Sequence, residues 1–140
     1  MNLKRVIITG IAVWFLGSIG AFITCGGLFN WVYQLPPNIW RTNAEIMTSS
    51  TMIWTNVIGI IIALLFAFVF AVVYKGVPGK GLKKGITYGL LVWLVGPIAG
   101  IPTMPFYMTI SNTVIIYWLI QSFVFHLIYG AAAGLLYKPE

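Results

Sequence analysis

The stretch IIIALLFAFVFAVVY, residues 60–74, decides the fold of this chain. A strand of a membrane β-barrel is about ten residues long and alternates apolar with polar side chains, whereas this run is apolar on every face. A helix is the only other element that satisfies all its backbone hydrogen bonds within lipid. The stretch therefore predicts a membrane-spanning helix.

Working outward from this run, the sequence contains four apolar stretches of about 20 residues or more. Such a length crosses a hydrocarbon layer about 30 Å thick at 1.5 Å per helical residue. The predicted spans are residues 6–25 (with an aromatic extension to residue 33), 52–74, 85–104 and 114–137. We expect an all-α membrane protein in which residues 1–140 form a single transmembrane domain, a four-transmembrane-helix bundle.

The composition supports this class and excludes several chemistries. Of the 140 residues, 60% are hydrophobic and 7% are charged, against about 25% charged residues in a soluble domain. The two acidic residues, Glu45 and Glu140, lie outside every span, so carboxylate-based catalysis or proton coupling within the membrane is excluded. One Cys and one His cannot form a zinc site within one chain. We expect no metal, no cofactor and no enzymatic activity.

The basic residues predict the orientation. Arg41 lies in the first loop, while the other seven of the eight basic residues flank the opposite ends of the spans. The positive-inside rule then places both termini and the middle link in the cytoplasm, in a plasma membrane. The net charge of +6 is expected to face anionic lipid head groups rather than nucleic acid. The seven residues are Lys4, Arg5, Lys75, Lys80, Lys83, Lys84 and Lys138.

An internal repeat relates the two halves of the chain. The segment KRVIITGIAVWFLGSIGA (4–21) aligns without a gap with KKGITYGLLVWLVGPIAG (83–100), with seven of 18 positions identical, including Trp14/Trp93. The alignment predicts two tandem helical hairpins, about 4–75 and 83–138, related as a parallel repeat. The first and third spans are expected either to meet near the centre of the bundle or to flank it.

Small residues on three of the spans predict how the bundle packs. Helices in lipid associate largely through close packing at small residues, because lipid is as apolar as the side chains themselves. The expected packing residues are Gly10, Gly17, Gly89, Gly96, Gly100, Gly130 and Gly134. Pro97 and Pro102 are expected to kink or end the third span near its outer half.

Few side chains within the spans are reactive. His126 is the only ionisable group well inside a span, and it is either a neutral ring bonded across the bundle to Thr9, Thr87 or Tyr88, or a haem ligand, proton relay or gate. Trp14 and Trp93 lie near mid-membrane, where they either fill space opposite glycines or line a central pocket. The candidate ligand or pathway residues are His126, Trp14, Trp93, Tyr88 and Ser122.

The remaining polar positions lie toward the outer side. Asn56 and Gln121 are expected to bond across helices or to line a shallow outer cavity, and Cys25 to pack as a small hydrophobic residue. The loop of residues 34–50 is expected to lie on the membrane surface, as a connector, a lid or a docking site. Pro36 and Pro37 should stop any helix there, and Thr48 and Thr51 offer caps for the second span.

One segment carries a resemblance. GKGLKKGITYGLLVWL, residues 79–94, resembles segments of uncharacterised four-span prokaryotic membrane proteins. The resemblance is local and implies no activity.

The spans hold many packing residues and few reactive ones. We therefore expect a non-enzymatic membrane protein that acts through helix packing, as an assembly or accessory subunit or a homo-oligomer. Two alternatives stay open. One is a small channel or carrier for a neutral or cationic solute, with a pathway between the two repeats. The other is an accessory subunit that binds haem or quinone through His126.

Overall fold

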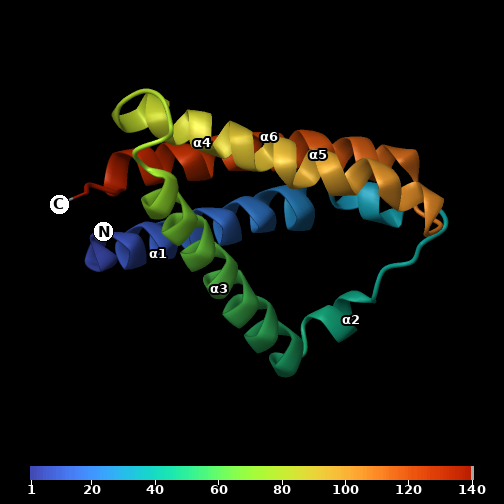
Figure 1. Cartoon of the computed structure of the whole chain (residues 1–140). Coiled ribbons are helices and arrows are strands. Elements are labelled where there is room, and N and C mark those ends of the chain that lie inside the picture. Colours follow the sequence, from blue (N-terminus) through green and yellow to red (C-terminus); the bar gives the residue numbers. More distant parts are fainter. Residues whose placement is uncertain (140) are drawn as a thin grey trace.

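The computed structural model describes residues 1–139, and within them it contains helices and loops but no strand (Figure 1). Four helical segments are long and apolar enough to cross a membrane: Leu3–Leu28, Ser49–Val73, Gly81–Phe106 and Asn112–Leu136. Their ends differ from the predicted ones by one to four residues. The prediction of an all-α, four-span fold is confirmed, and the chain has the architecture of a membrane protein.

The first span changes its helical form partway. Helix α1, Leu3–Ala21, begins where the side chain of Asn2 accepts a hydrogen bond from the Arg5 backbone N–H. It continues as a π-helix over Phe22–Leu28, followed by a 3₁₀-helix over Asn30–Gln34. The 3₁₀-helix ends two residues before Pro36, in agreement with the predicted helix stop. A π-helix is rare and often lies at a functional position.

The outer loop contains a short helix that the sequence reading missed. Helix α2, Asn43–Ile46, begins at a capping box in which Thr42 and Glu45 each bond the other's backbone N–H. Helix α3, Ser49–Val73, follows after Thr48, whose hydroxyl accepts from the Thr51 backbone N–H at 3.4 Å, as predicted.

The third span is broken, as its prolines predicted. Helix α4, Gly81–Val95, is followed by the one-turn helix α5, Pro97–Gly100, and by a 3₁₀-helix over Ile101–Phe106. Each proline lacks the N–H that would continue the helical ladder. Helix α6, Asn112–Leu136, forms the fourth span, and the Ser111 side chain caps its start.

The spans pack in the order α4–α6–α1–α3. The closest pair is α4 with α6, and α6 and α3 both contact α1. Helices α1 and α4 form no substantial interface with each other within the described residues, so they do not meet near the centre of the bundle; they lie on either side of α6. The two members of each predicted hairpin are in contact, but α4 and α6 run closely side by side whereas α3 diverges from α1 (Figure 1). The duplication itself stays a prediction.

Glycines set the tight contact between α4 and α6. A Cβ atom on Gly85 or Gly89 would fall on the backbone of α6 at Gly130, Gly134 or His126. Gly10 and Gly17 lie against α3 and α6: a Cβ on Gly10 would be 3.0 Å from the Leu64 Cα, and one on Gly17 would be 2.7 Å from the Tyr129 hydroxyl.

Two of the expected packing glycines, Gly96 and Gly100, do not lie at an interface between spans. A Cβ on Gly100 would meet no atom within 4 Å, and one on Gly96 would meet only the carbonyl oxygen of Val92 in its own span. Both follow the point where α4 ends, so their backbone does not continue the face that carries Gly85 and Gly89. The Gly96/Gly100 spacing therefore does not mark a helix interface in this structure.

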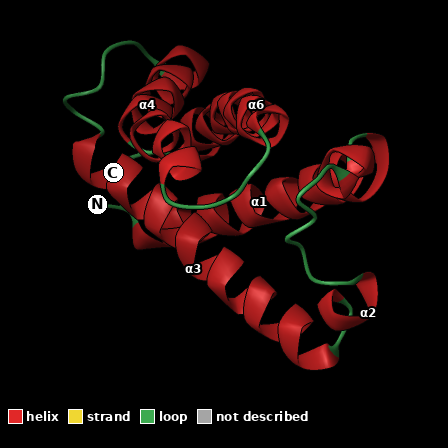
Figure 2. Cartoon of the chain, turned by 90° about the vertical axis from the view of Figure 1, so that its right-hand side faces the viewer, coloured by secondary structure: helices red, strands yellow, loops and turns green. Residues whose placement is uncertain are grey.

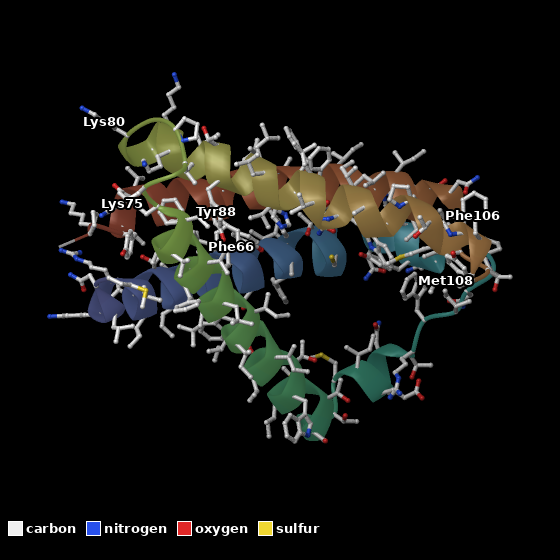
Figure 3. The ribbon with its side chains drawn as sticks, in the orientation of Figure 1. Phe66, Lys75, Lys80, Tyr88, Phe106 and Met108 are labelled. Atoms are coloured by element: carbon white, nitrogen blue, oxygen red, sulfur yellow. The ribbon has the colours of Figure 1, made fainter. Side chains whose placement is uncertain are left out.

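The inner end of the bundle is the best packed region. Phe70 of α3 is fully buried there, together with Tyr88 of α4 and Tyr137 after α6. The buried ammonium of Lys84 donates to the carbonyl oxygen of Tyr74 at 2.6 Å and lies 4.4 Å from the centre of the Tyr74 ring. It thereby caps the C-terminal end of α3, where a cation is favoured. Figure 3 shows Lys75 and Lys80 at this end and Phe106 and Met108 at the opposite one.

Helix α3 leaves the bundle toward its N-terminal end. Its buried residues, Ala63, Ala67 and Phe70, form one stripe in the inner half of the helix. From Met52 to Ile58 every residue is exposed. Figures 1 and 2 show this half of α3 standing clear of the other spans. A space between α3 and α6 results, and side chains of α1 form its floor.

Candidate functional site

A pocket of about 480 Å³ lies between α1, α3 and α6. This size falls within the range of small-molecule sites, about 300–1,000 Å³. Two of its wall residues, Asn56 and Ile62, are exposed on the surface of the molecule, so the pocket opens sideways toward the bilayer. We call it the α3 pocket; it is lined by Val13, Trp14, Gly17, Ser18, Ala21, Thr55, Asn56, Gly59, Ile62, Ala63, Phe66, His126 and Tyr129.

His126 lies in the wall of the α3 pocket and is bonded within its own helix. Its Nδ1 atom is 2.7 Å from the carbonyl oxygen of Ser122, one helical turn earlier. The prediction that His126 bonds across the bundle to Thr9, Thr87 or Tyr88 is therefore wrong. Tyr88 donates to the Phe66 carbonyl oxygen at 2.8 Å, and Thr87 donates to the Lys83 carbonyl oxygen at 2.9 Å. The hydroxyl of Thr9 is buried and has no partner among residues 1–139. For His126 and Thr87, the carbonyl oxygen four residues earlier in the same helix lies within hydrogen-bonding distance. A bond to it forms without the alignment of two helices.

Trp14 lines the same pocket. Its ring packs against Gly59, where a Cβ would lie 3.3 Å from Trp14 Cδ1. Trp14 thus stands opposite a glycine, as one of its two predicted roles required. It also lines a pocket, but this pocket lies between α1, α3 and α6 and does not include Trp93. The Trp14 indole N–H has no acceptor among residues 1–139.

Three other candidates lie outside the α3 pocket. Trp93 donates to the Ser122 hydroxyl at 3.1 Å and to the Leu119 carbonyl oxygen at 3.3 Å, and its ring stacks edge-on against Phe123. Tyr88 joins α4 to α3 through its bond to Phe66, whose ring centroid lies 4.8 Å from that of Tyr88; Figure 3 labels both residues where the two helices approach. Trp14 and Trp93 therefore do not share a central pocket, because α6 lies between the helices that carry them.

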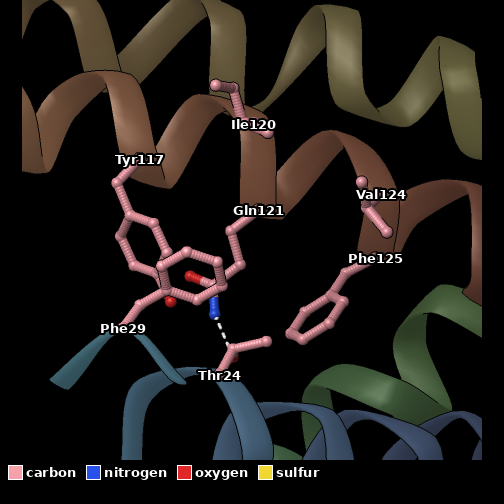
Figure 4. Close-up of a pocket in the computed structure, with 7 residues that line it drawn as sticks. All are labelled: Thr24, Phe29, Tyr117, Ile120, Gln121, Val124 and Phe125. Carbon is pink, nitrogen blue, oxygen red and sulfur yellow. Dashed lines mark hydrogen bonds between the residues drawn. The ribbon is translucent and has the colours of Figure 1, made fainter. Parts of the chain in front are cut away.

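A second, smaller pocket lies near the outer end of α6. Its volume is about 310 Å³, and we call it the outer pocket (Figure 4). The amide of Gln121 points across it and donates to the Thr24 hydroxyl at 2.6 Å, which ties the π-helix to α6. The lining residues are Thr24, Phe29, Tyr117, Ile120, Gln121, Val124 and Phe125.

Cys25 does not pack as a simple hydrophobic residue, contrary to our expectation. Its Sγ atom lies 3.2 Å from the Gln121 amide nitrogen, 3.4 Å from the Tyr33 hydroxyl and 3.7 Å from that of Tyr117. The reason is the π-helix, which presents two successive residues, Thr24 and Cys25, to the same glutamine. Gln121 thus bonds across helices and lines a cavity, both of which the sequence suggested.

Aromatic residues seal this polar cluster from the outer side. The Trp118 indole N–H donates to the Tyr33 hydroxyl at 3.0 Å, and Trp40 of the loop stacks edge-on against both rings. Burial, together with the contact to Cys25, raises the pKa of Tyr33 above its ordinary value of 10.0. Tyr33 therefore stays protonated at neutral pH. These contacts hold the loop, the π-helix, the following 3₁₀-helix and α6 together.

These side chains define what the site can do chemically. No group of three or more His, Cys, Asp or Glu that could hold a metal ion occurs within residues 1–139. The α3 pocket offers an imidazole, the hydroxyls of Ser18 and Tyr129, the indole of Trp14 and the amide of Asn56; Thr55 also lines it, with its hydroxyl bonded to the Thr51 carbonyl oxygen, and the remaining wall is apolar. Such a set suits binding of a largely apolar molecule through a few hydrogen bonds.

The fold and its pockets are those of a helical membrane protein with a cavity between its spans. Comparison with protein-family models, curated proteins and solved structures finds no match for this chain. Membership of a family of four-span prokaryotic membrane proteins, which the resemblance of residues 79–94 suggests, therefore stays a prediction.

Proposed function

We propose that this protein is a non-enzymatic membrane protein that binds a small, neutral, lipid-soluble molecule in the α3 pocket. The observation that carries the proposal is the 480 Å³ pocket between three spans, open to the side and walled by exposed Asn56 and Ile62. A ligand dissolved in lipid enters such a pocket without crossing water. This function develops the carrier hypothesis, whose pathway between the two repeats stays a prediction.

The wall of the pocket favours a neutral ligand. Phe66, Tyr129 and Trp14 supply aromatic surface, while the only acid among residues 1–139, Glu45, lies in the outer loop. A cation would therefore enter without a counter-ion, at a large desolvation cost. A neutral molecule loses little by leaving the lipid and gains the hydrogen bonds of the wall.

Binding of 2-methoxynaphthalene to the protein in nanodiscs tests this function. We expect saturable binding at one site per chain, beyond the partitioning measured in protein-free nanodiscs. The Gly59→Leu variant should abolish it, because the new side chain enters the pocket beside Trp14 without meeting backbone. Gly100→Leu is the matched control, since a Cβ there meets nothing within 4 Å. Equal binding in both variants, or no saturable binding of either 2-methoxynaphthalene or its hydroxyl analogue 2-naphthol, would contradict the proposal.

Assembly through helix packing remains a second candidate, and one observation favours it. Every residue of α3 from Met52 to Ile58 is exposed, and Ile53 and Trp54 are 61% and 63% exposed there. A second copy of this chain is the occupant we propose for this surface. In a Cys25→Ser background, Ile53→Cys should then form disulfide-linked dimers in native membranes. Ile120→Cys, 61% exposed on α6, should not. Monomer only from Ile53→Cys would count against assembly through α3.

We also propose a plasma-membrane location with both termini in the cytoplasm. The chain ends and the basic link carrying Lys75 and Lys80 lie at one end of the molecule (Figures 1 and 3), which supports this orientation under the positive-inside rule. Labelling of Lys4→Cys and Lys138→Cys variants with a membrane-impermeant maleimide, in the Cys25→Ser background, tests it. Neither should react in intact cells, and both should react after permeabilisation.

A further inference from the structure

The bond of His126 to its own helix fixes which ring nitrogen carries the proton. Nδ1 lies 2.7 Å from the Ser122 carbonyl oxygen. A carbonyl oxygen can only accept a hydrogen bond, so Nδ1 must be the donor. In a neutral imidazole the other nitrogen, Nε2, is then an acceptor with a free lone pair.

Nothing in the described chain uses this lone pair. Nε2 has no hydrogen-bond partner within residues 1–139, and His126 is part of the wall of the α3 pocket. The neighbouring rings are those of Phe66 and Tyr129, with centroids 6.4 and 6.1 Å from the imidazole. No carboxylate lies on any span to pair with an imidazolium.

The rest of the wall is rich in donors. Three donors of the wall have no acceptor among residues 1–139: the Trp14 indole N–H and the hydroxyls of Ser18 and Tyr129. The Asn56 amide donates to the Met52 carbonyl oxygen at 2.8 Å and has a second N–H. Many ligand oxygens can therefore be bound. The Asn56 side-chain oxygen can also accept a hydrogen bond, but Asn56 is exposed, whereas His126 is half-buried, so Nε2 is the acceptor that a ligand inside the pocket must satisfy. A ligand that satisfies it must bring an O–H or N–H of its own.

We infer that the ligand of the α3 pocket is a neutral, ring-sized alcohol or phenol whose hydroxyl donates to His126 Nε2. This inference rests on the proposed function and narrows its ligand class. The hydroxyl oxygen can in turn accept from a wall donor, so one hydroxyl engages both the acceptor and the donors of the pocket. A molecule with only carbonyl or ether oxygens leaves Nε2 unpaired, which is costly in an apolar site.

A matched pair of probes tests the inference. 2-Naphthol and 2-methoxynaphthalene share the same rings, and only the first has a hydrogen to donate. After correction for partitioning into protein-free nanodiscs, 2-naphthol should bind the wild-type protein about tenfold more tightly, the ratio typical of one hydrogen bond. Both probes should compete for one site, and Gly59→Leu should exclude both.

Two variants of His126 separate the hydrogen bond from packing. His126→Phe keeps a ring but removes the acceptor, so the preference for 2-naphthol should disappear while 2-methoxynaphthalene still binds. His126→Gln supplies a carbonyl oxygen in place of Nε2 and should retain part of the preference. Binding of the ether also shows that each variant is folded.

The outcomes distinguish the proposed function, ligand binding in the α3 pocket, from the inference that the ligand donates a hydroxyl to His126. Equal affinity for the two probes, or the same preference in wild type and His126→Phe, would overturn the hydroxyl-donor inference and leave the pocket function standing. Failure of both probes to bind wild type would overturn both. A haem absorption band in the purified protein, lost in His126→Phe, would show that Nε2 ligates iron and would also overturn the inference.

Discussion

Gly85 of α4 lies against Gly130 of α6 so closely that a Cβ atom on either residue would overlap the other's backbone. Main chain therefore meets main chain at this point. In lipid, where hydrophobic burial does not drive helices together, such proximity supplies the van der Waals contact that holds them. The position of α6 between α4 and α1 depends on this contact, and with it the shape of the α3 pocket.

Gly85→Ala should separate α4 from α6 and destabilise the protein by about 1–3 kcal/mol, the usual effect of overpacking a tight contact. Thermal unfolding in detergent measures the change. Gly100→Ala is the control, because open space surrounds that position. An unchanged melting temperature for Gly85→Ala would mean that the two helices are not in backbone contact.

Lys84→Met should destabilise the inner end of the bundle. The substitution removes the 2.6 Å bond to the Tyr74 carbonyl oxygen and the contact with the Tyr74 ring. A hydrogen bond to a charged group is worth about 1.5–3 kcal/mol, and this loss should appear as a lower melting temperature. Lys83→Met, at an exposed neighbouring position, should change it little. An equal fall in melting temperature for both substitutions would show that the loss of one positive charge, and not the contacts of Lys84 with Tyr74, causes the destabilisation.

His126 should be protonated at Nδ1. Because the chain has a single histidine, ¹⁵N-histidine labelling gives an NMR spectrum with two ring resonances and no assignment problem. With the ring neutral, we expect Nδ1 at the chemical shift of a protonated nitrogen and Nε2 at that of an unprotonated one. The opposite pattern would mean that the bond to Ser122 is absent.

The outer loop should lose order in acid. Hydrogen bonds from the Thr42 side chain and backbone N–H lower the pKa of Glu45 below its ordinary value of 4.5. The carboxylate is thus favoured in the folded loop. The stabilisation is present above pH 4.5 and disappears as the pH falls through the lower, folded value. A ¹³C NMR titration of the Glu45 carboxyl checks the direction.

Thr42→Ala removes the side-chain bond and the N-cap together. We expect it to return the Glu45 pKa toward 4.5 and to weaken α2, which starts at this cap. Thr55→Ala is the control, because that hydroxyl bonds only the Thr51 carbonyl oxygen of its own helix. A Glu45 titration that is identical in wild type and Thr42→Ala would contradict the role of the capping box.

Local chemistry along the chain predicts the class of this protein and where its helices begin, break and end. Unbroken apolar runs such as residues 60–74 leave no polar face, so in lipid they have only the helix available. Proline lacks an amide hydrogen, so the break at Pro97 was equally predictable. Capping by Thr48 follows in the same way from local chemistry. These features need no knowledge of what lies across the bundle.

Which spans touch, and what lies between them, depends on how the helices pack in three dimensions. Gly96 and Gly100 have the same spacing as Gly85 and Gly89, yet only the second pair faces α6, because the helix ends between the two pairs. Likewise His126 and Trp14 are 112 positions apart in the chain but share a pocket, while Trp93 lies beyond α6. A pocket is space left by the crossing of whole helices. Its existence depends on the angle at which α3 leaves α1, and no local pattern of side chains encodes that angle.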